Sequence, residues 1–173
     1  HNNKKYTTLF VDGNHENFDA LETYPIVTFK GARCHQIREN VYHVMRGETL
    51  EIGEHKIWCL GGATSHDKEH RTEFISWWSQ EEPNYNELTF AHQNFTDIKP
   101  DIMITHEGPL DIIKTIHYPQ HYHNSVANAL NHILWQALEN QNNVRWFFGH
   151  HHIEREWTIG TVQLQCLYDE IIE

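Results

Sequence analysis

Three short loops that contain histidine stand out as the part of this sequence that could do chemistry. Each loop comes directly after a short apolar run rich in β-branched or aromatic residues, which is typical of a buried strand. The three pairs of run and loop are residues 8–11 with 12–16, residues 102–104 with 105–109, and residues 144–148 with 149–152. Functional groups in α/β sheets gather outside the carboxyl ends of the strands. If the three strands are neighbours, we therefore expect one sheet edge to collect His15, His106, His150 and His152.

The residue types in these loops suit a metal site. Neutral imidazole is a common ligand for zinc, iron, manganese and nickel. His150 and His152 are two residues apart, so in an extended backbone their side chains would point to the same side. His151 would then point away, and we do not expect it to bind metal. Asn14 offers a neutral carbonyl oxygen, which suits a metal that must also hold an anionic phosphate.

Three motifs resemble those of the calcineurin-like metallophosphoesterases. The segment Gly13-Asn14-His15-Glu16 is similar to the GNH[D/E] motif of the family, Thr105-His106 to its single histidine at a strand end, and Gly149-His150-His151-His152 to its GHxH motif. Their order and approximate separation also match, and the likeness covers essentially the whole chain. The stretch from Gly61 to Arg71, followed by Trp77 and Trp78, is similar to a bacterial and phage-type branch of the family.

The resemblance implies a hydrolase that uses two divalent metal ions. It assigns Asn14, His106 and His150 to the second ion and His152 to the first ion. His15 would bind the substrate phosphate and protonate the leaving alkoxide. A metal-bridging hydroxide would attack phosphate mono- or diesters in line, with the two ions about 3.5–4 Å apart. Manganese is the first expectation for the metal, and iron, zinc and nickel suit the same ligands.

The chain departs from the family at its start. The N-terminal DxH and GDxxx[D/N] motifs, which complete the first metal site and supply the bridging carboxylate, are missing. We therefore expect this chain to be the C-terminal two-thirds of such a domain, with the opening βαβ portion removed or in a separate chain. Alone, it is expected not to hold a complete two-metal site. The alternative function is a protein-binding scaffold of the same fold with weakened metal sites, and metal binding by Asn14, His106 and His150 distinguishes the two.

Three further features have two readings each. Arg71 follows a glycine-rich strand exit, so it could contact substrate phosphate or form a surface salt bridge. Trp77 and Trp78 could line a substrate cleft, or they could pack in the core or an interface. The histidine-containing run at residues 117–123 could form a rim over the site or be a polar surface loop.

Patterns elsewhere predict an α/β fold with mixed sheets, formed by a single domain over residues 1–173. Helices are expected over residues 17–24 with Asn17 as N-cap, from near Pro83 to Phe95, and over residues 124–140, where apolar residues recur at helical spacing. Strands are expected over residues 41–45, 49–52 and 56–60, and two more over residues 156–168 with a turn at Gly160. The resemblance narrows this class to a β-sandwich flanked by helices (α/β/β/α).

Composition limits the partners. The formal net charge of −11 argues against a broad nucleic-acid-binding face, because such a face needs clustered Lys and Arg. A phosphate-ester substrate stays possible, since bound metal ions supply local positive charge. No stretch approaches the roughly 20 apolar residues of a membrane span, so no membrane partner is expected. The three cysteines stand far apart without a CxxC motif, which predicts buried reduced thiols and a reducing cytoplasm.

Overall fold

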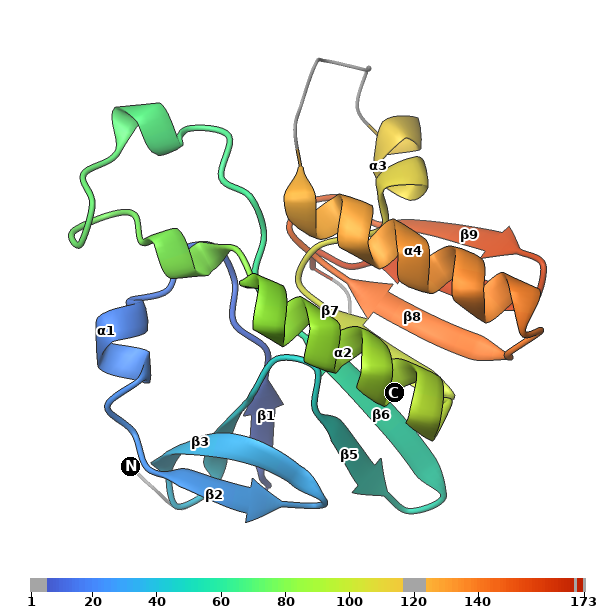
Figure 1. The fold of residues 1–173 in the computed structure, drawn as a ribbon, viewed down its shortest axis with the longest axis horizontal. Helices are drawn as coiled ribbons and strands as arrows, with labels where there is room; N and C mark the ends of the chain where they lie inside the picture. The colour runs from blue at the N-terminus through green and yellow to red at the C-terminus, as the bar shows by residue number, and fades with distance from the viewer. Residues whose placement is uncertain (1–5, 117–123, 170, 173) are drawn as a thin grey trace.

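The computed structural model describes residues 6–116, 124–169 and 171–172, and it contains two mixed β-sheets with helices beside them (Figure 1). The smaller sheet has the strand order β1-β4-β3-β2, formed by Thr8–Phe10, Val41–Val44, Ala32–Arg38 and Ile26–Phe29. In this sheet β1 is parallel to β4, and the other neighbouring strands are antiparallel. The general α/β class with mixed sheets is therefore confirmed.

The larger sheet has the strand order β5-β6-β7-β8-β10-β9, formed by Thr49–Ile52, His55–Leu60, Ile102–Thr105, Val144–Phe148, Val162–Cys166 and Arg155–Ile159. The inner strands β6, β7, β8 and β10 are parallel, and the edge strands β5 and β9 are antiparallel to their neighbours. Two of the three histidine loops follow the neighbouring strands β7 and β8. The third follows β1 in the other sheet, so the three strands are not all neighbours.

Two long helices cover one face of the larger sheet, α2 (Tyr85–Ile98) and α4 (Ser125–Glu139) (Figure 1). A capping box between Asn84 and Glu87 starts α2, and the Asn124 side chain caps α4. The predicted apolar stripe of α4 is buried in a core that also contains strand residues Trp58, Met103, Trp146 and Leu164. This core holds the strands that carry two of the histidine loops.

The shorter helices lie nearer the histidine loops in the sequence. Helix α1 (Phe18–Leu21) begins at Asn17 as predicted, where the side chain accepts a hydrogen bond from the Ala20 backbone, but it ends before Tyr24. Helix α3 (Leu110–Ile116) follows the loop after β7. Two 3₁₀ turns, η1 (Lys68–His70) and η2 (Ser79–Glu81), lie in the long connection between β6 and α2.

A second core joins the two sheets. Its buried residues come from β3 and β4 of one sheet and from β5 and β6 of the other, and they are Ala32, Cys34, Tyr42, Val44, Leu50 and Cys59. All three cysteines of the chain are buried and free, as expected. Burial raises the pKa of the Cys59 thiol to about 12, and it raises that of Cys34 and of Cys166 to about 11.

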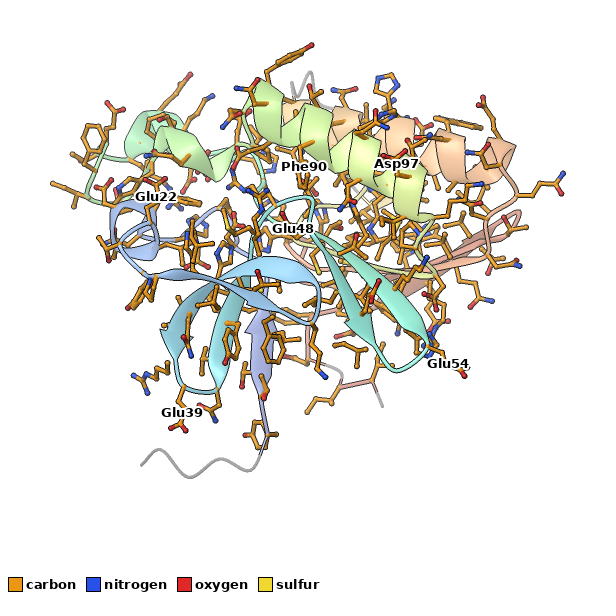
Figure 2. All side chains as sticks on the ribbon, turned by 60° about the horizontal axis from the view of Figure 1, so that its bottom comes forward. Glu22, Glu39, Glu48, Glu54, Phe90 and Asp97 are labelled. Carbon is orange, nitrogen blue, oxygen red and sulfur yellow. The ribbon has the colours of Figure 1, made fainter. Side chains whose placement is uncertain are left out.

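The predicted hairpins are also confirmed. Strands β5 and β6 turn at Gly53 and Glu54, and β9 and β10 turn at Gly160, which has a φ of 55°. Acidic side chains lie both in helices and in the connections, with Asp97 in α2, Glu22 after α1 and Glu39 in the turn between β3 and β4 (Figure 2). In the described part of the chain, no helix is long and apolar enough to cross a membrane.

Candidate metal centre

The loops after β1, β7 and β8 bring three predicted ligands together, although they start from two different sheets. Asn14 Oδ1 lies 3.1 Å from His106 Nε2. The His106 and His150 rings lie with their centroids 5.1 Å apart, tilted by 62°. Asn14 is 5% exposed, and the two histidines are partly buried. The structure therefore assembles an amide oxygen and two imidazoles at the ends of three strands.

Gly13 lets the Asn14 loop approach the His106 ring this closely. A Cβ at position 13 would lie 3.0 Å from His106 Cε1 and 3.2 Å from Nε2. Contacts this short force a side chain to shift by a few tenths of an ångström. The absence of a side chain at Gly13 is therefore what allows the first and second histidine loops to meet in this geometry.

Both central histidines are neutral at pH 7. Burial lowers the pKa of His150 to about 4, although the charge of Glu107 acts in the opposite direction. Burial also lowers the pKa of His106. Asn14 Oδ1 can only accept a hydrogen bond, so His106 Nε2 donates to it and carries the ring proton. Neutral imidazole binds a metal ion through its unprotonated nitrogen, so binding through His106 Nε2 would require the ring proton to move to Nδ1.

Glu107 is hydrogen-bonded to the loop that carries His150, and no role was predicted for this residue from the sequence. It is fully buried, and its Oε1 accepts hydrogen bonds from His151 Nε2 at 2.7 Å and from the Gly108 backbone at 2.8 Å. Its Oε2 accepts from Asn124 Nδ2 at 2.7 Å and lies 3.8 Å from His150 Nε2. His151, expected to point away from the site, is thus the residue that ties the loop to this carboxylate.

His15 and Arg71 form an exposed pair beside the three ligands. Arg71 Nη1 lies 2.6 Å from His15 Nδ1, and His15 Nε2 lies 3.3 Å from Asn14 Nδ2. Arg71 Nη2 also donates to Asp67 at 2.8 Å, and this bond and the Arg71 charge lower the Asp67 pKa. The salt bridge with Asp67 agrees with one of the two readings of Arg71, and contact with a substrate phosphate stays a prediction. Its Nε is a buried donor with no hydrogen-bond partner among the described residues.

His152 lies apart from these residues. It is exposed, and its ring stacks on Tyr168 with a centroid distance of 4.9 Å. The expectation of an extended backbone here is wrong, because φ is 66° at His150 and 52° at His152, both in the left-handed region. The alternation that would place these two side chains on one side therefore does not apply.

The remaining candidates divide in the same way. Trp78 is buried with Phe18 and Leu21, and its Nε1 donates to Asp19 at 2.9 Å, so it packs in a core. Trp77 is partly buried. The possible rim at residues 117–123 lies outside the described residues.

The three central side chains offer donor atoms of the types that bind a divalent ion. An amide oxygen and two neutral imidazoles suit manganese, iron, zinc or nickel, and the 3.1 Å between Asn14 Oδ1 and His106 Nε2 is short enough for both atoms to bind one ion. No three His, Cys, Asp or Glu side chains gather at metal-binding spacing within residues 6–116, 124–169 and 171–172. The candidate centre therefore depends on Asn14 as its third ligand.

No protein-family model matches the chain, and no curated protein matches it either. The case for a function therefore comes from the geometry of these loops. Beyond the predicted residues, that geometry adds Glu107, which holds the His150 loop, and Ser65, whose Oγ accepts a hydrogen bond from Asn14 Nδ2 at 2.8 Å. Neither Glu107 nor Ser65 occupies a position that the three motifs assign to a ligand. The only signal in the sequence was the glycine-rich stretch that leads to Ser65.

Proposed function

We propose that this chain is a metal-dependent phosphoesterase domain of the calcineurin-like type, which hydrolyses phosphate mono- or diesters. The observation that carries the proposal is the meeting of Asn14, His106 and His150 at the ends of β1, β7 and β8, with His15 and Arg71 beside them. Two packed sheets flanked by helices support the family's α/β/β/α sandwich as the finer fold assignment.

Asn14, His106 and His150 would hold the metal ion. A divalent ion held there supplies Lewis-acid polarisation of a phosphoryl oxygen. The protein contributes a neutral ligand set, since the amide and the two uncharged imidazoles leave the positive charge of the ion available for an anionic phosphate. Manganese remains our first choice, with iron, zinc and nickel as alternatives. The family uses two ions, and His152, proposed for the other ion, lies apart from this set.

Arg71 would bind the phosphate of the substrate. Its guanidinium group lies beside the exposed His15, and its Nη donors suit the oxygens of a phosphate. Asp67 holds the other end of the group through Nη2. Phosphate oxygens could replace the His15 ring as the acceptor for Nη1, because that ring is exposed.

His15 would act as the general acid. Its ring lies next to Asn14, so it faces a phosphate bound at the metal centre. In that position it can give a proton to the leaving alkoxide, which matters most for alcohols that leave poorly. His15 is exposed, so its proton can be replaced from solvent after each turnover.

Calorimetric titration of the chain with Mn²⁺ tests the proposal. Asn14→Ala, His106→Ala and His150→Ala are each expected to weaken binding by at least about 100-fold, since loss of an outer-shell partner alone typically costs about 10–100-fold. His132→Ala, which removes an exposed histidine from α4, is the matched control and should bind like the wild type. A parallel assay follows hydrolysis of a generic phosphodiester and a generic phosphomonoester.

Two results would refute the proposal. The first is unchanged Mn²⁺ affinity in all three ligand variants. The second is a wild-type chain that binds none of Mn²⁺, Fe²⁺, Zn²⁺ or Ni²⁺, which would favour the protein-binding scaffold as the function of this fold.

A further inference from the structure

A buried carboxylate lies behind the metal centre. Glu81, at the end of η2, is 0% exposed. It accepts two hydrogen bonds from Ser65, one from the backbone N–H at 3.0 Å to Oε1 and one from the hydroxyl at 2.7 Å to Oε2. Burying an ionised carboxylate is costly unless its oxygens are satisfied. The two hydrogen bonds from Ser65 therefore account for the burial of the Glu81 carboxylate.

A chain of hydrogen bonds joins Glu81 through Ser65 to the candidate ligand Asn14, and each donor in it determines the next acceptor. A carboxylate can only accept, so the Ser65 hydroxyl must donate to it. The lone pairs of Ser65 Oγ are then left to accept, and Asn14 Nδ2 donates to them at 2.8 Å. With its nitrogen held by Ser65, Asn14 turns its Oδ1 toward His106 Nε2 at 3.1 Å.

The backbone around Ser65 is fixed to match. Gly62 N donates to Asp12 O at 2.9 Å, and Ala63 N donates to Glu81 O at 3.1 Å. Gly62 has a φ of 87°, and a Cβ there would lie 2.6 Å from Glu81 O. The glycine-rich exit from β6 therefore fits between the Asn14 loop and η2, and this fit places Ser65 between Asn14 and Glu81.

We propose that Ser65 and Glu81 are positioning residues that determine which end of the Asn14 amide faces the metal centre. The inference rests on the proposed function, because it concerns a ligand of the proposed metal. Only the amide oxygen can bind a cation, since the nitrogen carries two hydrogens and has no free lone pair. A turned Asn14 would present N–H groups to the ion and would also oppose the N–H of His106 Nε2.

Two variants remove this control in different ways. Ser65→Ala deletes the nearer acceptor for Asn14 Nδ2, at 2.8 Å, and leaves the longer contact with His15 Nε2 at 3.3 Å. Glu81→Gln replaces one of the two accepting oxygens with an N–H₂ group, which must then oppose one of the two Ser65 donors. Ser65→Thr keeps the hydroxyl and is the rescue variant. The matched control is Ser125→Ala, because the Ser125 hydroxyl donates to the neighbouring carboxylate Glu82 as the Ser65 hydroxyl donates to Glu81.

The experiment has one readout that needs no metal and one that does. In the metal-free protein, nitrogen-15 chemical shifts of the His106 ring report which nitrogen carries the proton, which is Nε2 in the wild type. Ser65→Ala and Glu81→Gln are expected to lose this tautomer preference and to bind Mn²⁺ about 10–100-fold more weakly in calorimetry. Ser65→Thr and Ser125→Ala should retain both properties.

The outcomes separate this inference from the proposed function. A tautomer change in a protein whose wild type binds no metal supports the positioning role and refutes the metal function. Wild-type tautomer and Mn²⁺ affinity in both variants would overturn the positioning role while leaving the metal function intact. Equal losses in Ser125→Ala would also overturn it, because the effect would then be a general one on folding. If Ser65→Ala does not fold, Glu81→Gln decides the matter by the same two readouts.

Discussion

The substitution Glu107→Gln tests the electrostatics beneath the His150 loop. In the wild type both oxygens of this buried carboxylate accept hydrogen bonds, from His151, Gly108 and Asn124. Glutamine has almost the same shape, but one of its two terminal groups is a donor. In either orientation that N–H₂ group meets a donor, so at least one buried hydrogen bond is lost. We expect the variant to be less stable at pH 7.

The size of the effect follows from the pKa of Glu107. Burial by itself raises this pKa, but the hydrogen bond from His151 and the electrostatic attraction of the nearby His150 and His151 rings outweigh it and lower the pKa from 4.5 to about 2. A tenfold change in proton affinity corresponds to about 1.4 kcal/mol, so the difference is worth on the order of 3 kcal/mol. Because the folded-state pKa lies below the unfolded-state value, this stability is present above pH 4.5 and is lost as the pH falls toward 2.

Titration of His150 reduces the pH-dependent change that can be observed in the stability gap between the wild type and Glu107→Gln. Its own pKa is lowered from 6.5 to about 4, so the wild type also loses stability as the pH falls between these values. In Glu107→Gln the favourable carboxylate charge is gone, and His150 becomes harder still to protonate in the folded state. We therefore expect the stability gap between wild type and variant to shrink by about 2–3 kcal/mol from pH 7 to pH 2.

Urea unfolding measured at pH 7, 5, 3 and 2 checks this expectation, provided that the urea dependence of the free energy is the same for both proteins. Glu54→Gln, which removes an exposed carboxylate from the β5–β6 turn, is the control for simple loss of charge (Figure 2). If the wild type and Glu107→Gln lose stability in parallel across this range, Glu107 does not carry the low pKa, and the reasoning is wrong.

Three further predictions concern close packing, catalysis and the thiols. Gly61→Ala should lower the free energy of unfolding, measured in urea, by about 3 kcal/mol, because its Cβ would lie 1.9 Å from Asp12 Oδ1. Gly149→Ala is the control and should cost less than about 1 kcal/mol, because its Cβ would lie 3.7 Å from Leu167 O. Equal losses in the two variants would contradict this reasoning. His15→Ala should keep the wild-type Mn²⁺ affinity and lose about 10²–10⁴-fold in turnover for esters with poor leaving groups, and equal losses for good leaving groups would refute the acid role. Alkylation by iodoacetamide at pH 8 should be slow in the folded protein and fast in urea at all three cysteines, and rapid labelling of the folded chain would contradict their raised pKa values.

The parts of the fold that the sequence predicts are those with a local pattern. Helix α4 has both an N-cap at Asn124 and a helical apolar stripe, and the β5–β6 hairpin has its turn at Gly53. Strands β2 and β3 lack such a signal. In β3 the burial pattern does not alternate, and a register irregularity between Gln36 and Arg38 interrupts its pairing with β4. Strands β2 and β3 form a hairpin around Lys30 and Gly31, which both have a positive φ (51° and 86°). A lysine in the left-handed region is uncommon, so this turn is not one that sequence patterns predict.

The candidate site divides along the same line. The types and spacing of Asn14, His106 and His150 predict a shared centre, and the structure brings them together. The role of Ser65 depends on a hydrogen bond across 51 residues of sequence, so nothing near either residue announces it. The extended backbone expected at His150 and His152 is wrong, because a left-handed φ at a histidine is uncommon and sequence patterns do not predict it.

The candidate metal centre also depends on residues 60–62, although this segment contains no ligand. Asn14 comes from the smaller sheet, while His106 and His150 come from the larger one, so the distance between ligands depends on how the sheets pack. The segment that follows β6 is hydrogen-bonded to both ligand loops. Gly62 N donates to Asp12 O in the Asn14 loop, and His106 N donates to Leu60 O at the end of β6. Residues 60–62 thus tie the first ligand loop to the second through two backbone hydrogen bonds. Both bonds join backbone atoms, but the connection depends on glycine at positions 61 and 62, where a Cβ would lie 1.9 Å from Asp12 Oδ1 and 2.6 Å from Glu81 O. The ligand geometry therefore depends on a segment that contains no ligand.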